Sequence, residues 1–292
     1  MYNYTNCPVC KSQTFSDFLN CEDYTVSHEK FNIVSCDACG FKFTNPLPDI
    51  EKLGSYYKSE EYISHSDTTK GLISKLYHLV RKRTIKAKLE IVSSHVSRGT
   101  LLDYGCGTGA FLDAARQSGW KTFGLEPDSG ARKMAFESGL NVSGDKEVLQ
   151  QKTRDHKFNA ITLWHVLEHV TDLEETLSFF KNKLNREGAL IVAVPNHKSF
   201  DALHYGNNWA AYDVPRHLYH FDKDSLEKLM STAGFRLVKM YPMKYDSFYV
   251  SMLSEKHKNG SINYLKAFFI GLRSNMKAKQ ASEYSSVIYV FQ

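Results

Sequence analysis

The sequence lacks long apolar runs, an apolar leader and internal repeats, and each absence narrows the class of protein. The longest apolar runs, such as residues 189–194, have the length of a β-strand, well short of the roughly 20 residues that span a bilayer. The first residues, Met1–Tyr4, are polar, so a secretory signal is not expected. We therefore expect a cytoplasmic protein without a membrane span.

The sequence also lacks a strong excess of charge of either sign. It has 37 basic and 32 acidic residues, a net charge of +5. This balance permits an anionic substrate but does not demand nucleic acid. With 42% hydrophobic and 24% charged residues in 292, the chain can form a folded core in one large domain, with or without a small second one.

Cysteine is scarce, but four of the six cysteines form two pairs near the N-terminus, Cys7-x-x-Cys10 and Cys36-x-x-Cys39. Each pair can present two thiolates to one metal, and four cysteine ligands are typical of a closed, structural zinc site. A module of about 45 residues buries little core, so the metal would supply much of its stability. Two fortuitous pairs of buried thiols are the alternative.

Three regions follow one another along the chain. Residues 1–48 form the cysteine-bearing module and end in two prolines, which indicate a boundary. Residues 49–98 have helical spacing of apolar residues and are interpreted as a linker or lid. Residues 99–292 form the main domain, with an insertion at about 243–283.

Strands and helices alternate throughout the main domain. The predicted strands are 100–104, 121–125, 141–143, 159–164, 188–194, 236–241 and 285–291. The predicted helices are 110–118, 129–138, 172–184 and 222–233, and residues 195–221 are expected to form a long loop. Such alternation predicts a Rossmann-like α/β fold with a seven-stranded, mostly parallel sheet and helices on both faces. A small zinc-ribbon-like module would precede it.

The insertion contains a basic amphipathic helix, predicted at residues 262–279. A membrane or a second subunit is one possible contact for it. We expect instead that its apolar residues Phe268, Phe269 and Leu272 pack on the protein's own core.

A glycine-rich turn follows the first predicted strand, in the segment Asp103-Tyr104-Gly105-Cys106-Gly107-Thr108-Gly109. A parallel strand that enters a glycine turn and then a helix makes a nucleotide-sized cleft at the carboxyl end of the sheet. Glycines let a ligand approach the backbone closely. Gly105-x-Gly107-x-x-Ala110 also fits a relaxed dinucleotide fingerprint, so a nicotinamide oxidoreductase is an alternative.

Three segments together resemble the class I S-adenosylmethionine methyltransferases, in particular a small-molecule group with a Leu-Glu-His segment. They are the turn with its preceding acid Asp103, the segment Gly124–Asp128, and the segment Leu163–His169. The resemblance implies that Gly105 and Gly107 pack against the cofactor, that Glu126 accepts hydrogen bonds from its ribose, and that Asp145 contacts adenine. The other implied cofactor-site residues are Asp103, Cys106, Pro127, Trp164 and His165.

Methyl transfer from a sulfonium requires positioning of the acceptor and, for some acceptors, removal of a proton. Histidine suits that task near neutral pH. His217 is the first candidate for the base, followed by His169 and His165. Ordering of loop backbone is the alternative for His169 and His217.

The segment Trp209–Phe221 contains a Pro-Arg-His sequence that resembles the same group. Arg216 would hold an anionic acceptor, or serve as a structural salt-bridge partner. Trp209 and Tyr212 would line the acceptor site. Tyr57 and Tyr62 lie in the segment that folds over the cofactor as a lid in related enzymes, and an interdomain contact is their alternative.

The cysteine module resembles the N-terminal zinc module of sugar C-methyltransferases. We therefore expect a monomer or homodimer that moves a methyl group from S-adenosylmethionine, leaving S-adenosylhomocysteine, to oxygen or carbon of a small molecule such as a sugar or a nucleotide-linked intermediate. RNA methylation and a catalytically inactive binding protein are the alternatives. Residues 1–48 contain three lysines, no arginine and five acids, a composition that does not favour nucleic acid.

Overall fold

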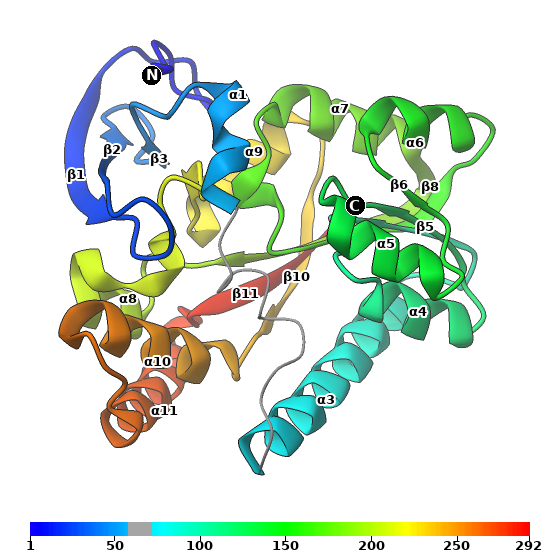
Figure 1. Cartoon of the computed structure of the whole chain (residues 1–292). Helices are drawn as coiled ribbons and strands as arrows, with labels where there is room; N and C mark the ends of the chain where they lie inside the picture. Colours follow the sequence, from blue (N-terminus) through cyan, green and yellow to red (C-terminus); the bar gives the residue numbers. More distant parts are fainter. Residues whose placement is uncertain (58–71) are drawn as a thin grey trace.

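The computed structural model describes residues 1–57 and 72–292 and is built around a seven-stranded sheet of order β10-β11-β8-β7-β4-β5-β6 (Figure 1). The strands are β4 (Thr100–Tyr104), β5 (Lys121–Leu125), β6 (Val142–Ser143), β7 (Phe158–Trp164), β8 (Leu184–Pro195), β10 (Leu237–Pro242) and β11 (Ser286–Phe291). The strands from β6 to β8 pair in parallel, while β11 runs antiparallel to both of its neighbours. The predicted Rossmann-like architecture is confirmed.

Helices cover both faces of this sheet. The longer ones are α3 (Leu72–His95), α4 (Ala110–Gln117), α5 (Ser129–Glu137), α6 (Lys146–Lys152), α7 (Leu173–Lys183), α9 (Lys223–Thr232), α10 (Asp246–Asn259) and α11 (Tyr264–Ala281). Alternate residues of β8 enter two different hydrophobic clusters, with Leu190 and Val192 in one and Ala189 and Ile191 in the other. Burial on both faces explains why this strand is a continuous apolar run in the sequence.

The predicted loop 195–221 is more ordered than expected. It contains α8 (Phe200–Tyr205), the single turns η3 (Gly206–Asn208) and η4 (Ala210–Tyr212), and β9 (Tyr219–His220). Ser199 caps α8 by accepting a hydrogen bond from the Ala202 backbone N–H at 3.3 Å. Elements this short leave little periodicity in a sequence, because tertiary contacts rather than an apolar stripe hold them.

The N-terminal region forms a second, four-stranded sheet of order β1-β2-β3-β9. Its first three strands are β1 (Phe15–Glu22), β2 (Lys30–Cys36) and β3 (Lys42–Thr44), followed by α1 (Ile50–Leu53) and η1 (Gly54–Tyr57). The fourth strand comes from the main domain, since Phe43 pairs with Tyr219 across β3 and β9. Phe41, Phe43 and Leu47 belong to the same buried cluster as Tyr219. The two regions therefore share a sheet and a core.

The insertion forms α10 and α11, which pack against each other and against α8. The buried positions of α11 are small residues, Ala267, Gly271, Ser274 and Ala278. Phe268, Phe269 and Leu272 are exposed, so the expectation that they pack on the protein's own core is wrong. The reason is close backbone approach: a Cβ at Gly271 would lie 3.0 Å from the backbone nitrogen and Cα of Phe248 in α10. Among the described helices, none is long and apolar enough to cross a bilayer.

Candidate active site

The glycine turn lies between the end of β4 and the start of α4. The backbone N–H groups of Gly105 and Cys106 both donate to the carbonyl of Leu125, at 2.8 and 2.9 Å. Gly105 has φ +77° and a Cβ there would lie 2.5 Å from Val166, so the turn requires glycine at that position. A Cβ at Gly107 would meet no atom within 4 Å, which leaves its backbone open to a ligand.

The carboxylate of Glu126, at the end of β5, lies against this turn. One oxygen accepts the Gly107 backbone N–H and the other accepts the Asp128 backbone N–H, each at 2.8 Å. Burial raises the pKa of Glu126, while these two hydrogen bonds lower it in part. The carboxylate is therefore held rigidly beside the exposed backbone of Gly107.

Asp103 lies beneath the turn and is fully buried. Burial raises its pKa to about 7, and the Thr162 hydroxyl, which donates to it at 2.6 Å, opposes the shift. Its second oxygen has no hydrogen-bond partner among the described residues. An orphaned carboxylate oxygen at this depth is costly unless a donor reaches it.

Trp164 ends β7 on the same side of the sheet. Its ring packs edge-on against Phe111 of α4, with the centroids 5.1 Å apart. The ammonium of Lys88 lies 4.4 Å from the Trp164 ring centre. Burial lowers the pKa of Lys88, and Asp246 and Asp103 oppose that shift.

His165 follows Trp164 and is held between two acids. Its Nε2 lies 3.1 Å from a carboxylate oxygen of Asp246, and its Nδ1 lies 3.4 Å from Glu168. Burial acts to lower the pKa of His165, but the two acids outweigh it and raise the pKa to about 9. The imidazole is therefore positively charged at neutral pH.

His169 and His217 face each other next to the buried Glu168, with their ring centres 4.6 Å apart. The Nδ1 of His169 lies 3.0 Å from the Arg216 carbonyl, and the Nδ1 of His217 lies 2.9 Å from the Ala211 carbonyl. A carbonyl only accepts, so each Nδ1 carries a proton and Nε2 is the ring atom that can accept one.

Burial and the neighbouring His217 lower the pKa of His169 to about 4, so its ring is neutral at pH 7. One carboxylate oxygen of Glu168 and one nitrogen from each of His169 and His217 lie within 4.8 Å of one another. Two imidazole lone pairs and a carboxylate can take up a proton or hold a metal ion.

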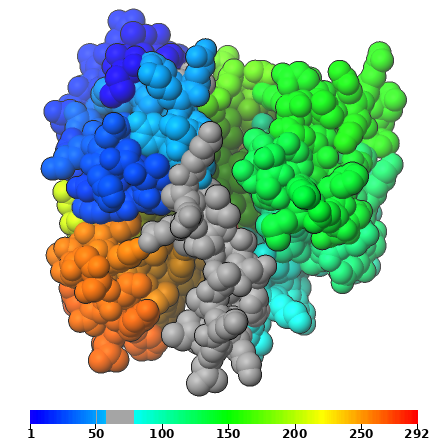
Figure 2. Space-filling model, in the orientation of Figure 1, coloured from blue at the N-terminus to red at the C-terminus, as the bar shows by residue number. Residues whose placement is uncertain are grey.

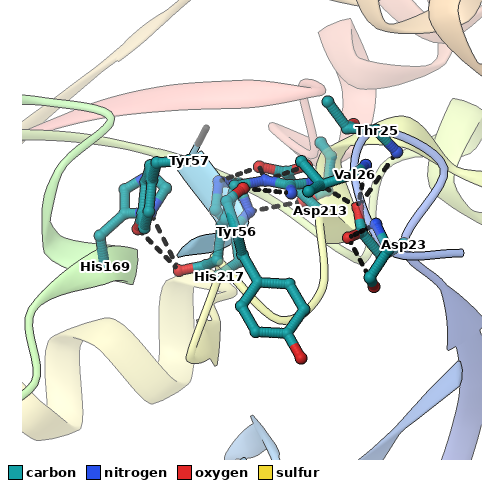
Figure 3. Close-up of polar contacts among 11 residues, drawn as sticks. Asp23, Thr25, Val26, Tyr56, Tyr57, His169, Asp213 and His217 are labelled. Carbon is teal, nitrogen blue, oxygen red and sulfur yellow. Dashed lines mark hydrogen bonds and ion pairs between the residues drawn. The ribbon is translucent and has the colours of Figure 1, made fainter. Parts of the chain in front are cut away.

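Arg216 anchors the loop that carries His217, and its partners Asp23, Tyr56 and Asp213 are labelled in Figure 3. Its Nη2 donates to Asp23 at 2.9 Å and to Asp213 at 2.6 Å, and its Nη1 donates to the Tyr56 carbonyl at 2.8 Å. The side chain is 1% exposed. The guanidinium therefore joins the β1–β2 turn, the η1 segment and the η4 loop, in keeping with the salt-bridge alternative for this residue.

The four cysteines of the N-terminal module meet at one point. Cys7 Sγ lies 3.7 Å from Cys39 Sγ, and Cys10 Sγ lies 3.5 Å from Cys36 Sγ. Four sulfurs bound to one zinc at about 2.3 Å would be about 3.8 Å apart. Lys11 and Gly40, the residues that follow the two pairs, both have positive φ, at +62° and +73°. The donor set and the spacing both fit a tetrahedral zinc ion.

A family model described as a methyltransferase domain matches residues 76–240, more than half of the 292-residue chain. The chain belongs to this methyltransferase family. The match decides between the two interpretations of the glycine turn, and the predicted resemblance to class I S-adenosylmethionine methyltransferases is confirmed.

Curated relatives include two ubiquinone biosynthesis O-methyltransferases. The one from Pasteurella multocida is 29% identical over 140 residues, which cover 42% of this chain and 58% of the relative. The one from Actinobacillus pleuropneumoniae serotype 7 is 30% identical over 135 residues, which cover 42% of this chain and 58% of the relative. The chain thus spans less than two thirds of the length of these relatives.

Two solved methyltransferase structures share the fold. The magnesium protoporphyrin IX methyltransferase of Synechocystis PCC 6803 with bound S-adenosylhomocysteine has a TM-score of 0.53 at 13% identity, covering 83% of this chain and 99% of that one. The phosphoethanolamine N-methyltransferase 2 of Haemonchus contortus with S-adenosylmethionine has a TM-score of 0.53 at 12% identity, covering 86% of this chain and 61% of that one.

In the methyltransferase domain, the structure brings together most of the predicted cofactor residues. The turn residues, Glu126, Pro127, Trp164 and His165 all lie at the carboxyl ends of β4, β5 and β7. Asp145 lies at the start of α6, where its carboxylate caps the helix by accepting the Val148 N–H at 2.7 Å. The cap is a structural use of this acid, and its contact with adenine stays a prediction.

Two of the predicted acceptor residues of the methyltransferase are buried, and their role stays a prediction. Trp209 is 2% exposed and donates from Nε1 to Asp201 at 2.8 Å, and Tyr212 is 3% exposed. The Tyr57 hydroxyl lies 2.9 Å from His169 Nδ1. Tyr62 lies outside the described residues.

Glu168 stands within the Leu-Glu-His segment, but three other polar residues of the site carry no clear signal in the sequence. Lys88, Asp246 and Asp23 come from distant segments, and the contact between Asp23 and Arg216 joins residues 193 positions apart. No local motif marks such partners, because only the folded chain brings them together.

Proposed function

We propose that this protein transfers a methyl group from S-adenosylmethionine to an oxygen atom of a small-molecule acceptor and releases S-adenosylhomocysteine. The observation that carries the proposal is the rigid pairing of Glu126 with the exposed backbone of Gly107 in a methyltransferase domain. A fixed carboxylate next to open backbone suits a ribose with two adjacent hydroxyls.

We expect one side chain and the backbone of the glycine turn to contact the cofactor. Glu126 would accept the ribose hydroxyls, and the open backbone of Gly107, where no side chain intrudes, would lie against the remainder of the molecule. The bound cofactor supplies an activated methyl group on a sulfonium. The enzyme's remaining tasks are to position the acceptor and to accept its proton.

Of the facing pair His169 and His217, His217 is better suited to accept that proton, because burial lowers the pKa of His169 to about 4. Both rings hold their Nδ1 proton against a backbone carbonyl, which leaves Nε2 as the basic atom. His217 is our first choice for the base, because its loop follows the fifth predicted strand, next to the Leu-Glu-His segment. The buried carboxylate of Glu168 would stabilise the imidazolium that forms.

The acceptor class rests on two separate comparisons. The curated relatives are named O-methyltransferases, which favours oxygen as the acceptor atom. The four-cysteine module favours a sugar or nucleotide-linked intermediate, and with it transfer to carbon as a second candidate reaction. Residues 1–48 carry five acids against three lysines, so RNA is the weaker candidate.

The N-terminal module is proposed to hold one zinc ion through Cys7, Cys10, Cys36 and Cys39. The sulfur spacing supports this proposal, and so does the positive φ of Lys11 and Gly40, the residues that follow the two cysteine pairs. A closed set of four thiolates leaves no open position for a reactant, so the role is structural.

The function can be tested by giving the purified protein methyl-labelled S-adenosylmethionine together with a metabolite extract and, separately, bulk RNA. We expect label in a small molecule, with S-adenosylhomocysteine formed in equal amount. Label in RNA alone would show that the acceptor is RNA rather than a small molecule. Tight binding of NAD without binding of S-adenosylmethionine, measured by calorimetry, would reject the proposal.

A further inference from the structure

Helix α11 has most of its large apolar residues on the outside, whereas Ile270 packs against a buried cluster. Its buried positions are Ala267, Gly271, Ser274 and Ala278. In contrast, Leu265, Phe269 and Met276 expose 75%, 62% and 61% of their surface. A surface helix of a soluble domain normally has the opposite arrangement, with the apolar stripe turned inward.

The outward stripe is continuous along the helix. Its members recur at spacings of three and four residues, so they lie on one side of α11. The exposed apolar residues are Tyr264, Leu265, Phe268, Phe269, Leu272 and Met276, and we call this set the α11 face. Figure 1 places α10 and α11 together at a corner of the molecule, and Figure 2 shows that corner, in orange, at the surface.

Buried contacts fix the rotation of α11 about its axis. The Ser274 hydroxyl donates to the buried carboxylate of Asp201 at 2.6 Å. Gly271 packs so closely on Phe248 that a side chain at this position would collide with the backbone of α10. Turning the α11 face inward would break the buried hydrogen bond and place phenyl rings where only a hydrogen atom fits. The packing of α11 on α10 therefore keeps the α11 face exposed.

The charged residues within helix α11 have one sign. Helix α11 contains four basic residues, Lys266, Arg273, Lys277 and Lys279, and no acid. The Lys266 ammonium is paired with Glu255 at 2.9 Å. Lys277 and Lys279 are exposed in the last turns of the helix. A symmetric contact between two copies would place these like charges near one another, because each copy presents the same surface.

An anionic lipid surface can accept both the apolar residues of the α11 face and the basic residues of helix α11. Apolar side chains enter the boundary between headgroups and acyl chains, while lysine and arginine remain at the level of the anionic headgroups. We propose that the α11 face docks this protein on an anionic bilayer surface, with α11 lying in the plane of the interface. The contact is peripheral and does not require a spanning helix.

The test is flotation of the full-length protein with vesicles of phosphatidylcholine alone and with about 30% phosphatidylglycerol. We expect binding to the anionic vesicles that weakens as salt is raised, because screening reduces the attraction of the lysines. The double variant Phe268→Ser, Phe269→Ser removes two rings that are more than half exposed, and because Phe268 also stacks on Phe248 of α10, its folding is checked by circular dichroism. We expect its binding to fall by about tenfold or more.

Phe136→Ser is the matched control, since Phe136 of α5 is 72% exposed but lies away from this helix. It should leave vesicle binding unchanged. Lys277→Glu with Lys279→Glu should weaken binding to anionic vesicles alone. Absence of flotation with anionic vesicles would overturn the proposal. A concentration-dependent dimer in light scattering that the Phe268→Ser, Phe269→Ser variant abolishes would assign the face to a second copy instead.

Discussion

At the scale of single residues, Glu126 carries the cofactor assignment. Glu126→Gln removes the negative charge but keeps the size of the side chain. Hydrogen bonds to a charged group contribute about 1.5–3 kcal/mol, so we expect S-adenosylhomocysteine to bind about tenfold or more weakly in calorimetry. Glu137→Gln, at the surface of α5, is the control and should bind normally. Equal affinity for all three proteins would remove Glu126 from the cofactor site.

His217 can act as a base or merely order its loop, and two variants separate these roles. His217→Ala should lower kcat by about 10²-fold if the imidazole is the general base. The side-chain N–H of His217→Asn can still donate to the Ala211 carbonyl, which the His217 ring contacts at 2.9 Å. It cannot accept a proton. Activity near the wild-type level in His217→Asn would assign a loop-ordering role.

His165 links stability to pH. Its pKa is raised to about 9 in the folded protein, above the ordinary value of about 6.5. The contribution of His165 to the free energy of unfolding is therefore fully present below about pH 6.5 and is lost as pH rises through about 9. The urea midpoint should fall across this window. Asp246→Asn should flatten the fall, and an unchanged slope in that variant would contradict the ion-pair assignment.

At the scale of elements, Arg216 joins two segments that each contribute an acid. Arg216→Lys cannot reproduce the fork that reaches Asp23, Asp213 and the Tyr56 carbonyl together. Breaking a buried ion pair costs about 3–5 kcal/mol, and we expect a loss of that size in urea unfolding. Adding Asp23→Asn should cost less in the Arg216→Lys background than alone, because the partner is already lost. Additive losses would argue against the network.

Helices and strands could be predicted where the residues that determine them are close together in the sequence. Strands β4 and β5 match their predicted bounds, since each is a buried apolar stretch followed by a glycine turn or an acid. The helix α10 and the β9 strand were missed. β9 is two residues long, and it is a strand only because β3 lies beside it. Pairing across the fold determined its conformation, and no pattern within Tyr219–His220 encodes that.

At the scale of the whole molecule, the four-cysteine module and the methyltransferase domain share the β3–β9 pairing and one buried cluster. We therefore expect the metal-loaded protein to unfold in a single calorimetric transition. Cys36→Ser should release the zinc, measured as metal per chain, and lower the Tm of that transition. Cys21→Ala, at a buried cysteine outside the metal site, should retain the metal. Two separate transitions would show that the module folds independently.

The sequence by itself determined the fold class, the glycine turn, Glu126 and the four cysteines. All of these follow from periodicity or from spacing within short segments, where chain geometry limits the choices. The tertiary structure alone decided the distant partners Asp23 of Arg216 and Asp246 of His165, because those contacts cross 193 and 81 positions of the chain. It also decided the direction of the α11 face. The sequence shows that one side of α11 is apolar, but close packing on α10 determines that this side faces outward.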